Sequence, residues 1–384
     1  MWRHIASNFL TLAVGLLLVI GGIVAWAKSQ YVQPGPLAQA ICLKVEKGSN
    51  FRKVADQLEA RGAVSYPYIF RVGADYSGRT KGLKAGSYLV PAGASMEAIV
   101  VQVTGTGVST CGAEINYRIR VTGTDVVISE LDPATGEMAE KAKFDPVAGP
   151  VPDIYKQMLD SGDARVAVTV AEGATSWQII DALSRAPLLT GAVKDVPAEG
   201  TLAPQQYEIA KNQTRADLVS EMLANQSAIL KKAWDGRAEG LPYKTPDEAL
   251  VMASLIEKET GVPAERAHVA SVFLNRMAQG MKLQTDPAVI YGITKGQGVL
   301  GRGLRQSELK AKTPFNTYVI DGLPPSPIAN PGAAAIEAAV HPDVTKDLFF
   351  VADGTGGHVF AETLDEHNRN VAKWRAIEAQ QGGG

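Results

Sequence analysis

Cysteine is scarce in this chain, with two residues among 384. Two thiols cannot build a disulfide-dense scaffold or a four-cysteine zinc site. An excess of charge of either sign is also missing, because 38 basic residues stand against 40 acidic ones and give a formal net charge of −2. This balance argues against a nucleic-acid-binding protein guided by a basic surface. The hydrophobic content of 46% is ordinary for a globular protein and argues against global disorder.

Long hydrophobic runs are absent with one exception near the N-terminus. Residues 9–27 (FLTLAVGLLLVIGGIVAWA) carry no charge, and about 20 apolar residues cross a hydrocarbon core roughly 30 Å thick. Ala25-Trp26-Ala27 resembles a signal-peptidase site, but the run is longer than the roughly 7–15 apolar residues of a signal peptide. We therefore favour an uncleaved membrane anchor over a removable signal. Arg3 before the run predicts a cytoplasmic tip, so that residues 1–30 form tip and transmembrane helix.

A first compact module is predicted over residues 41–107, opening with a strand at 41–45 and a helix at 50–61. Part of it recurs 125 residues later, because Val45-x-x-Gly48 returns as Val170-x-x-Gly173 in front of a second helical pattern. Such strand–turn–helix units resemble the LysM-type modules that hold glycan chains. The alternative, a generic strand–turn–helix without glycan binding, stays open.

The rest of the chain divides into two segments that differ in the periodicity of their hydrophobic residues. Residues 108–163 alternate in polarity around a turn at 132–136, which predicts a β-rich insertion. Residues 164–376 are predicted to form the catalytic domain, which opens with the second LysM-like unit and is then mainly helical. Its expected helices span residues 217–234, 245–260, 264–279, 332–340 and 364–380. Residues 377–384 end in three glycines and are predicted to be a flexible tail.

The helix predicted at 245–260 carries the strongest candidate for chemistry. On a helical wheel its apolar residues form one stripe, and Glu259 falls inside that stripe, whereas Glu257 falls on nearly the opposite side, where solvent accounts for it. An acid in an apolar setting at a helix C-terminus has a raised pKa, which suits a general acid. The alternative is a structural glutamate paired with Arg266, Arg276 or Arg302.

Several loops after this helix are rich in amides, hydroxyls, aromatic rings and prolines. They are LQTDPAVIYG at residues 283–292, PFNTY at 314–318, GLPPSPIANPG at 322–332 and FFVADGTGGHVF at 349–360. Amide and hydroxyl groups beside aromatic rings suit sugar hydroxyls and N-acetyl groups. Ordinary Asx-turn and proline-turn chemistry is the alternative explanation.

Other candidate motifs point away from metals and phosphates. His358 and His367 are nine residues apart, which fits no usual zinc spacing, so we expect a surface or loop role for both. Asp353-Gly-Thr-Gly-Gly lacks the Gly-Lys-Ser/Thr ending of a phosphate loop and predicts a tight turn. Cys42 and Cys111 can pair in an oxidising compartment, and the sequence leaves this open.

Taken together, residues 252–261 and these four loops resemble the endolytic murein transglycosylases, the MltG or YceG-like family. The resemblance implies an α+β protein with a transmembrane helix, a LysM-like α/β module and a mainly helical, lysozyme-like catalytic domain. The β-rich stretch at 108–163 departs from the family pattern. The catalytic residue of the family corresponds to Glu259 here. Substrate-binding positions of the family correspond to Gln284, Thr285, Asp286, Tyr291, Asn316, Tyr318 and Asn330.

The implied activity is that of a lytic transglycosylase, a carbon–oxygen lyase. It would cleave the MurNAc–GlcNAc β-1,4 bond within peptidoglycan strands, leave 1,6-anhydroMurNAc ends and so terminate or trim nascent strands. The resemblance implies no metal or other cofactor and no nucleic-acid partner. It implies a place in the cytoplasmic membrane, with the catalytic domain outside the cytoplasm beside cell-wall synthases. Two alternatives stay open: a lysozyme-like hydrolase that pairs Glu259 with Asp286, and a non-catalytic glycan-binding assembly factor.

Overall fold

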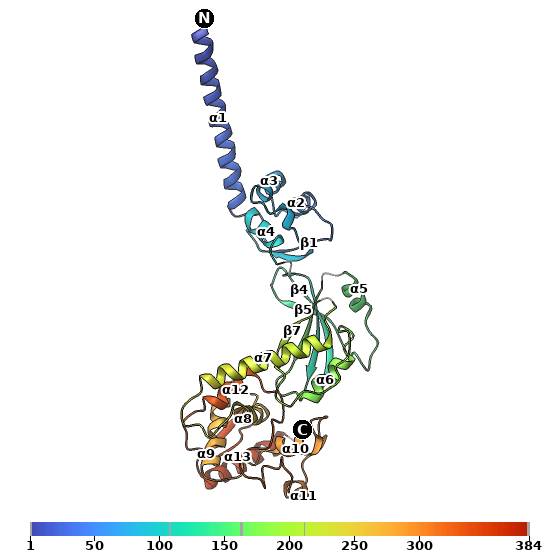
Figure 1. The fold of residues 1–384 in the computed structure, drawn as a ribbon, viewed down its shortest axis with the longest axis vertical. Helices are drawn as coiled ribbons and strands as arrows, with labels where there is room; N and C mark the ends of the chain where they lie inside the picture. The colour runs from blue at the N-terminus through green and yellow to red at the C-terminus, as the bar shows by residue number, and fades with distance from the viewer. Residues whose placement is uncertain (1, 107–108, 162–163, 211, 382–384) are drawn as a thin grey trace. The chain divides into compact units, whose positions relative to one another are not determined.

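The computed structural model of the chain describes residues 2–106, 109–161, 164–210 and 212–381. It shows a mixture of helices and strands, as the predicted α+β class requires (Figure 1). Two compact units divide the chain. The first comprises residues 1–115, 127–143 and 151–165, and the second comprises residues 116–126, 144–150 and 166–384.

Helix α1 (Trp2–Val32) contains the apolar run. Its segment Leu10–Val32 has a mean hydropathy of 2.4, and it is the one helix in the described ranges long and apolar enough to cross a membrane. Large side chains along it are exposed, for example Leu12 at 74% and Leu18 at 72%. A helix with this composition fits a single-pass membrane anchor, because exposed apolar side chains are stable in lipid and not in water.

The first unit contains the module predicted from the sequence. Its elements are β1 (Ile41–Val45), α2 (Phe51–Ala60), α3 (Pro67–Tyr76), the 3₁₀ helix η1 (Thr80–Gly82), β2 (Gly86–Val90) and α4 (Met96–Val103). Helix α2 begins where the side chain of Asn50 accepts a hydrogen bond from the Lys53 N–H, a standard N-cap. Strands β1 and β2 pair antiparallel. A disulfide joins Cys42 of β1 to Cys111, so the pairing that the sequence left open is present.

A five-stranded sheet follows in the order β5-β4-β3-β6-β7. Its strands are β3 (Ala113–Arg120), β4 (Gly123–Leu131), β5 (Met138–Phe144), β6 (Arg165–Val170) and β7 (Gln206–Glu208), with α5 (Asp153–Ser161) between β5 and β6. The sequence predicted an insertion that ends at residue 163. In the structure β3 is hydrogen-bonded to β6, so that boundary falls inside the sheet. Alternating polarity identifies strands but does not identify their partners.

The predicted repeat has the same local geometry in both copies, the second of which ends in α6 (Ser176–Arg185). Gly48 and Gly173 have φ angles of 76° and 77°, in the left-handed region that favours glycine. Each copy also has a buried tyrosine, Tyr88 or Tyr207, on the strand that pairs with its first strand. Each hydroxyl donates to the carbonyl four residues earlier, at 3.0 Å and 2.7 Å respectively. The two copies therefore share a glycine in the left-handed region and a buried tyrosine with the same local hydrogen bond.

The second unit is mainly helical after β7. Its elements are α7 (Arg215–Asp235), α8 (Pro246–Glu259), η2 (Pro263–Glu265), α9 (Arg266–Ala278), α10 (Asp286–Thr294), α11 (Gln306–Leu309), α12 (Ala333–Val340), β8 (Phe349–Ala352), β9 (His358–Ala361) and α13 (Leu364–Gln381). Helix α8 is the centre of the core and packs against α7, α9, α10 and α12. Helix α13 extends to Gln381, into the predicted tail, and residues 382–384 lie outside the described residues.

Candidate active site

Glu259 is the last residue of α8, and local sequence signals place it there. Thr245 caps the helix start by accepting from the Glu248 N–H at 3.2 Å, and Pro246 occupies the first helical position. The Glu248 carboxylate in turn accepts from the Lys244 N–H, one residue before the cap. Since residues 249–256 are all buried, α8 is fixed along its length and holds Glu259 at a defined point.

The carboxyl group of Glu259 is buried and has an unusual pKa. Its pKa is raised to about 7, chiefly by burial and also by the negative charge of Asp286. The Thr285 hydroxyl, His358 and Arg276 act in the opposite direction. Oε1 of Glu259 and Oγ1 of Thr285 are both buried, and apart from their contact with each other neither has a hydrogen-bond partner among the described residues. Buried polar atoms usually make more hydrogen bonds than this, so each retains hydrogen-bonding capacity for a ligand.

The predicted substrate-binding residues fall into two groups, and the first surrounds Glu259. Thr317 holds the adjoining loop, because its hydroxyl accepts from the Thr285 N–H at 2.9 Å and donates to the Thr285 carbonyl at 3.0 Å. Gln284 is exposed, with a φ of 55°. Tyr318 donates to the Asp286 carboxylate at 2.7 Å. Thr285, Asp286 and Tyr318 are thus brought near the carboxyl group of Glu259, and Gln284 directly precedes Thr285 in the chain.

The second group stabilises loops. Asn316 is fully buried, and its amide nitrogen donates to three backbone carbonyls, those of Glu308, Leu309 and Ala311. Asn330 is also fully buried; it accepts from the Leu202 N–H at 2.8 Å and donates to the Ala174 carbonyl at 3.0 Å. With their amides engaged in this way, both residues position the backbone around the site and do not present hydrogen-bonding groups to a glycan.

Glu199 is a buried acid that the sequence analysis missed, and it organises the same region. Its carboxylate accepts from the Ser176 N–H at 2.7 Å, from the Tyr291 hydroxyl at 3.1 Å and from the Asn330 amide at 3.2 Å. Burial raises its pKa, and the hydrogen bonds from Ser176 and Tyr291 oppose the increase. Tyr291 therefore links α10 to this network and lies apart from the group around Glu259. No sequence pattern singled out Glu199, because it lies in a loop without helical or strand periodicity.

The arginines proposed as structural partners of Glu259 have other partners. Arg266 lies 3.5 Å from Glu172, and Arg302 lies 2.6 Å from Glu308. Arg276 is buried and donates to the Leu348 and Leu283 carbonyls at 2.6 Å and 2.8 Å. It thereby ties β8 to the loop that leads to Thr285, and its charge acts on Glu259 from a fixed position.

The expectation that solvent accounts for Glu257 is wrong. Its side chain is half-buried and accepts from the Gly332 N–H at 3.0 Å, at the N-cap of α12. Burial raises its pKa, and this hydrogen bond lowers it. A helical wheel gives the direction in which a side chain points but not the element that packs on that side. Helix α12 packs against this face of α8. Glu257 thus satisfies an unpaired donor at a helix start.

The expectation for His358 is also wrong. This residue begins β9, and its side chain is 17% exposed and paired with Glu265 at 2.7 Å. The tight turn predicted at Asp353 is present, whereas the surface or loop role expected of His367 is wrong, because this residue is half-buried in α13. Asp353 accepts from the Thr355 N–H at 2.7 Å and forms the expected tight turn. His367 stacks on Phe349 with ring centroids 5.1 Å apart, and burial lowers its pKa.

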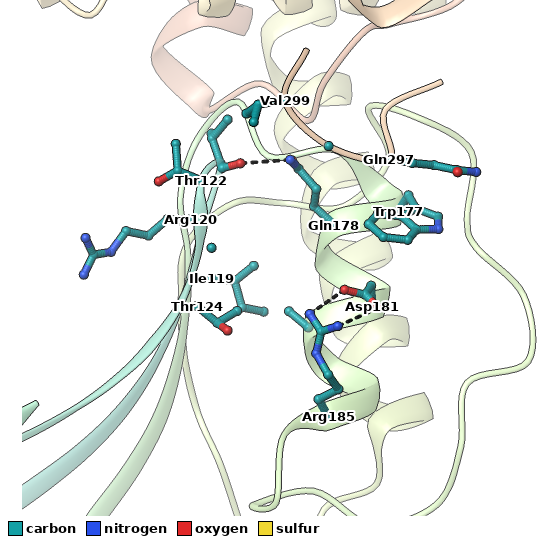
Figure 2. Close-up of a pocket in the computed structure, with 14 residues that line it drawn as sticks. Ile119, Arg120, Thr122, Thr124, Trp177, Gln178, Asp181, Arg185, Gln297 and Val299 are labelled. Carbon is teal, nitrogen blue, oxygen red and sulfur yellow. Dashed lines mark hydrogen bonds and ion pairs between the residues drawn. The ribbon is translucent and has the colours of Figure 1, made fainter. Parts of the chain in front are cut away.

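A hollow of about 230 Å³ lies elsewhere in the second unit, between the β3–β4 turn and α6 (Figure 2). Trp177 and Gln178 of α6 and Gln297 of a following loop line it, and Asp181 pairs with Arg185 on its wall. Glu259 does not line it. In the part of the chain that the structure describes, no group of three or more His, Cys, Asp or Glu side chains could hold a metal ion.

A buried carboxyl group with a pKa near neutrality, ringed by hydroxyl, imidazole and carboxylate groups, is the arrangement of an acid–base enzyme. Comparison with known proteins places the chain more narrowly. The model of the YceG-like family matches residues 148–373, and the chain belongs to this family.

Curated relatives extend the match over most of the chain. It is 28% identical to the endolytic murein transglycosylase of Bacillus subtilis (strain 168) over 359 residues, which cover 93% of this chain and 91% of the relative. It is 30% identical to the endolytic murein transglycosylase of Streptococcus pneumoniae (strain D39) over 346 residues, 87% of this chain and 58% of the relative. A crystal structure of a YceG-like protein from Listeria monocytogenes matches with a TM-score of 0.46 and 24% identity, over 86% of this chain and 99% of that one.

Proposed function

We propose that this protein is a membrane-anchored lytic transglycosylase that cleaves the MurNAc–GlcNAc β-1,4 bond inside peptidoglycan strands. The observation that carries the proposal is Glu259, a buried carboxyl group whose pKa of about 7 keeps it protonated in a large fraction of molecules at neutral pH. A protonated acid is what the first step of glycoside cleavage requires. The names of the curated relatives supply the substrate class.

In the first step the O–H bond of Glu259 breaks and its proton goes to the glycosidic oxygen, while the bond from C1 of MurNAc to that oxygen breaks. In the second step the carboxylate of Glu259 takes the proton of the C6 hydroxyl of the same sugar, and O6 closes onto C1. The product is a 1,6-anhydroMurNAc end, and no water is consumed. Because the substrate supplies its own nucleophile, one carboxyl group serves both steps, unlike the usual paired-carboxylate glycosidase.

A pKa near the working pH suits this double role. A group with a much lower pKa would rarely be protonated for the first step, and one with a much higher pKa would rarely be ionised for the second. Oε1 of Glu259 and the neighbouring Thr285 hydroxyl are the atoms we assign to the reacting oxygens of the glycan. Gln284, Asp286 and Tyr318 border them and are assigned to substrate hydroxyl and N-acetyl groups.

The setting of the enzyme follows from two further features. Helix α1 fits a membrane anchor, and we propose that it is inserted with its N-terminus in the cytoplasm and the two units outside. The disulfide between Cys42 and Cys111 supports this orientation, since disulfides persist in oxidising exported compartments. The duplicated β1–α2 and β6–α6 units are proposed to be LysM-like and to hold glycan strands. An anchored enzyme reaches strands near the membrane, where it would terminate or trim new material beside cell-wall synthases.

The test is a digestion of intact sacculi by the full chain in detergent, with products identified by mass spectrometry. We expect fragments with anhydro ends from the wild type and none from Glu259→Gln. Glu257→Gln is the matched control on the same helix: its amide oxygen still accepts from the Gly332 N–H, so activity should remain within a few-fold of the wild type.

Each rival predicts a different product pattern. Fragments with reducing MurNAc ends would show hydrolysis. Hydrolysis is the most direct alternative reaction, because the carboxylate of Asp286 acts on Glu259 and could serve as its partner. Sacculi that bind the protein but release no fragments would show a glycan-binding assembly factor. A fully active Glu259→Gln variant would overturn the assignment of the catalytic residue.

A further inference from the structure

Helix α1 packs against the first module and does not end in a free linker. The ring of Trp26 meets the ring of Tyr66, the N-cap residue of α3, edge to face with centroids 5.2 Å apart. Five residues further along α1, the ring of Tyr31 lies on Gly73 of α3, so closely that a Cβ atom at Gly73 would overlap it. The approach of the two helices therefore requires glycine at this position.

The segment that follows α1 is held by the same module. The Gly35 N–H donates to the Gly93 carbonyl at 3.1 Å, and the Gly93 N–H donates to the Leu37 carbonyl at 2.9 Å. The side chain of Leu37 is buried in the core of the module. Because the chain contacts the module both before and after the end of α1, the position of the module follows that of the helix.

In a membrane that α1 crosses, these contacts fix the depth of α3, which lies beside the end of α1 (Figure 1). The uncharged run ends at Ala27, so Trp26 lies where the hydrocarbon core meets the headgroups, a usual place for tryptophan. Tyr31 lies about 6 Å beyond Ala27 along the helix, and a headgroup layer is roughly 5–7 Å thick. Helix α3 therefore runs outward across that layer, with its first residues nearest the hydrocarbon.

The exposed side of α3 carries large side chains that suit this environment. Three of them follow one another at four-residue spacing and so share one face of the helix. They are Tyr68 at 69% exposure, Val72 at 47% and Tyr76 at 95%. The guanidinium of Arg71 lies 5.9 Å from the centre of the Tyr68 ring, whereas the carboxylate of Asp75 accepts from the Thr80 hydroxyl at 3.1 Å. Aromatic rings beside an arginine fit the boundary between acyl chains and phosphate groups.

We propose that α3 is a second membrane contact of this protein, whose face of Tyr68, Val72 and Tyr76 lies in the phospholipid headgroup layer that α1 crosses. This inference rests on the proposed anchoring by α1 and adds a surface of the folded module to it. The contact holds the first module against the lipid at a set depth. A protein or glycan partner on this face would leave it in water in the isolated chain, and the test separates these occupants.

The test places a spin label at single positions of the full chain in nanodiscs of phosphatidylethanolamine and phosphatidylglycerol. Cys42 and Cys111 are joined to each other, so an introduced cysteine is the one free thiol of the chain. Labels at Tyr68→Cys, Val72→Cys and Tyr76→Cys are compared by their collisions with oxygen, which is enriched in lipid, and with a water-soluble nickel chelate. We expect an oxygen-to-nickel ratio several-fold above the aqueous value at Tyr68→Cys and a lower ratio at Tyr76→Cys, because α3 runs outward.

Lys47→Cys is the matched control, at an exposed position in the turn between β1 and α2 of the same module. Strand β1 lies farther from the apolar run than α3 does (Figure 1), so this label should give the aqueous ratio. Ratios at the three α3 positions that equal the ratio of Lys47→Cys would overturn the inference and leave this face to a protein or glycan partner. Equally raised ratios at all four positions would also overturn it, because they would show non-specific adsorption of the module.

The proposed function fails in a different way. A chain that enters nanodiscs but releases no anhydro fragments from sacculi would overturn the proposed activity and leave the lipid contact standing. A chain that does not enter nanodiscs would overturn the proposed anchoring and the lipid contact together.

Discussion

Replacing Glu259 by glutamine should make the protein more stable above neutral pH while it removes activity. The pKa of Glu259 is about 7 in the folded protein against an ordinary value of 4.5. Since the folded state holds the proton more tightly, stability is greatest below pH 4.5 and falls as the pH rises from about 4.5 to 7. The difference between these two pKa values corresponds to roughly 3 kcal/mol of folding stability, almost all of which is lost by pH 7. Glutamine cannot ionise and avoids this loss.

The assay is urea unfolding of the wild type and Glu259→Gln at pH 4.5 and pH 8, followed by the signal of the second unit. We expect similar free energies of unfolding at pH 4.5 and an advantage of about 2–3 kcal/mol for the variant at pH 8. Glu362→Gln, at an exposed position of the same unit, should show no such advantage. A Glu259→Gln variant that is less stable than the wild type at pH 8 would refute a buried, desolvated acid at this position.

Three further predictions concern other residues. Asp286→Asn removes a charge that raises the pKa of Glu259, so the alkaline limb of the activity profile should move to lower pH, with KM raised because Asp286 is assigned to the substrate; a loss of kcat by several orders of magnitude would instead favour the hydrolase. Asn330→Ala removes the acceptor of the Leu202 N–H and the donor to the Ala174 carbonyl. It should lower stability by about 2–4 kcal/mol in urea titrations, and an unchanged midpoint would contradict its positioning role. Replacing Cys42 and Cys111 by serine removes a disulfide between residues that are 69 positions apart. The loss should lower the free energy of unfolding of the first unit by about 4 kcal/mol. Identical melting curves of this variant and the wild type under non-reducing conditions would rule that out.

Much of the secondary structure was predictable because it depends on local signals. The strand predicted at 41–45 matches β1, and the helix predicted at 245–260 matches α8 with its Thr245 cap. The repeat was visible because a glycine turn between a strand and a helix leaves the same pattern twice. Glu259 was identified as a candidate because an acidic side chain within an apolar stripe is unusual. The periodicity of a single helix is enough to show it.

Features that depend on partners distant in sequence were decided by tertiary structure. Glu257 was expected in solvent but caps α12, because helical periodicity does not say what packs on a given face. Asn316 and Asn330 carry the amide groups expected of a glycan site, yet the packing of the loops uses them internally. Only the fold brings Glu265 and His358, 93 residues apart, to the end of α8.

Local sequence signals were therefore sufficient to predict a membrane-spanning helix, many of the helices and strands, and Glu259 as the candidate acid. Tertiary structure decided which groups surround that residue. The physical reason is that the intrinsic chemistry of a carboxyl group is local, whereas its pKa depends on burial and on charges that folding brings together from α9, α10 and β9.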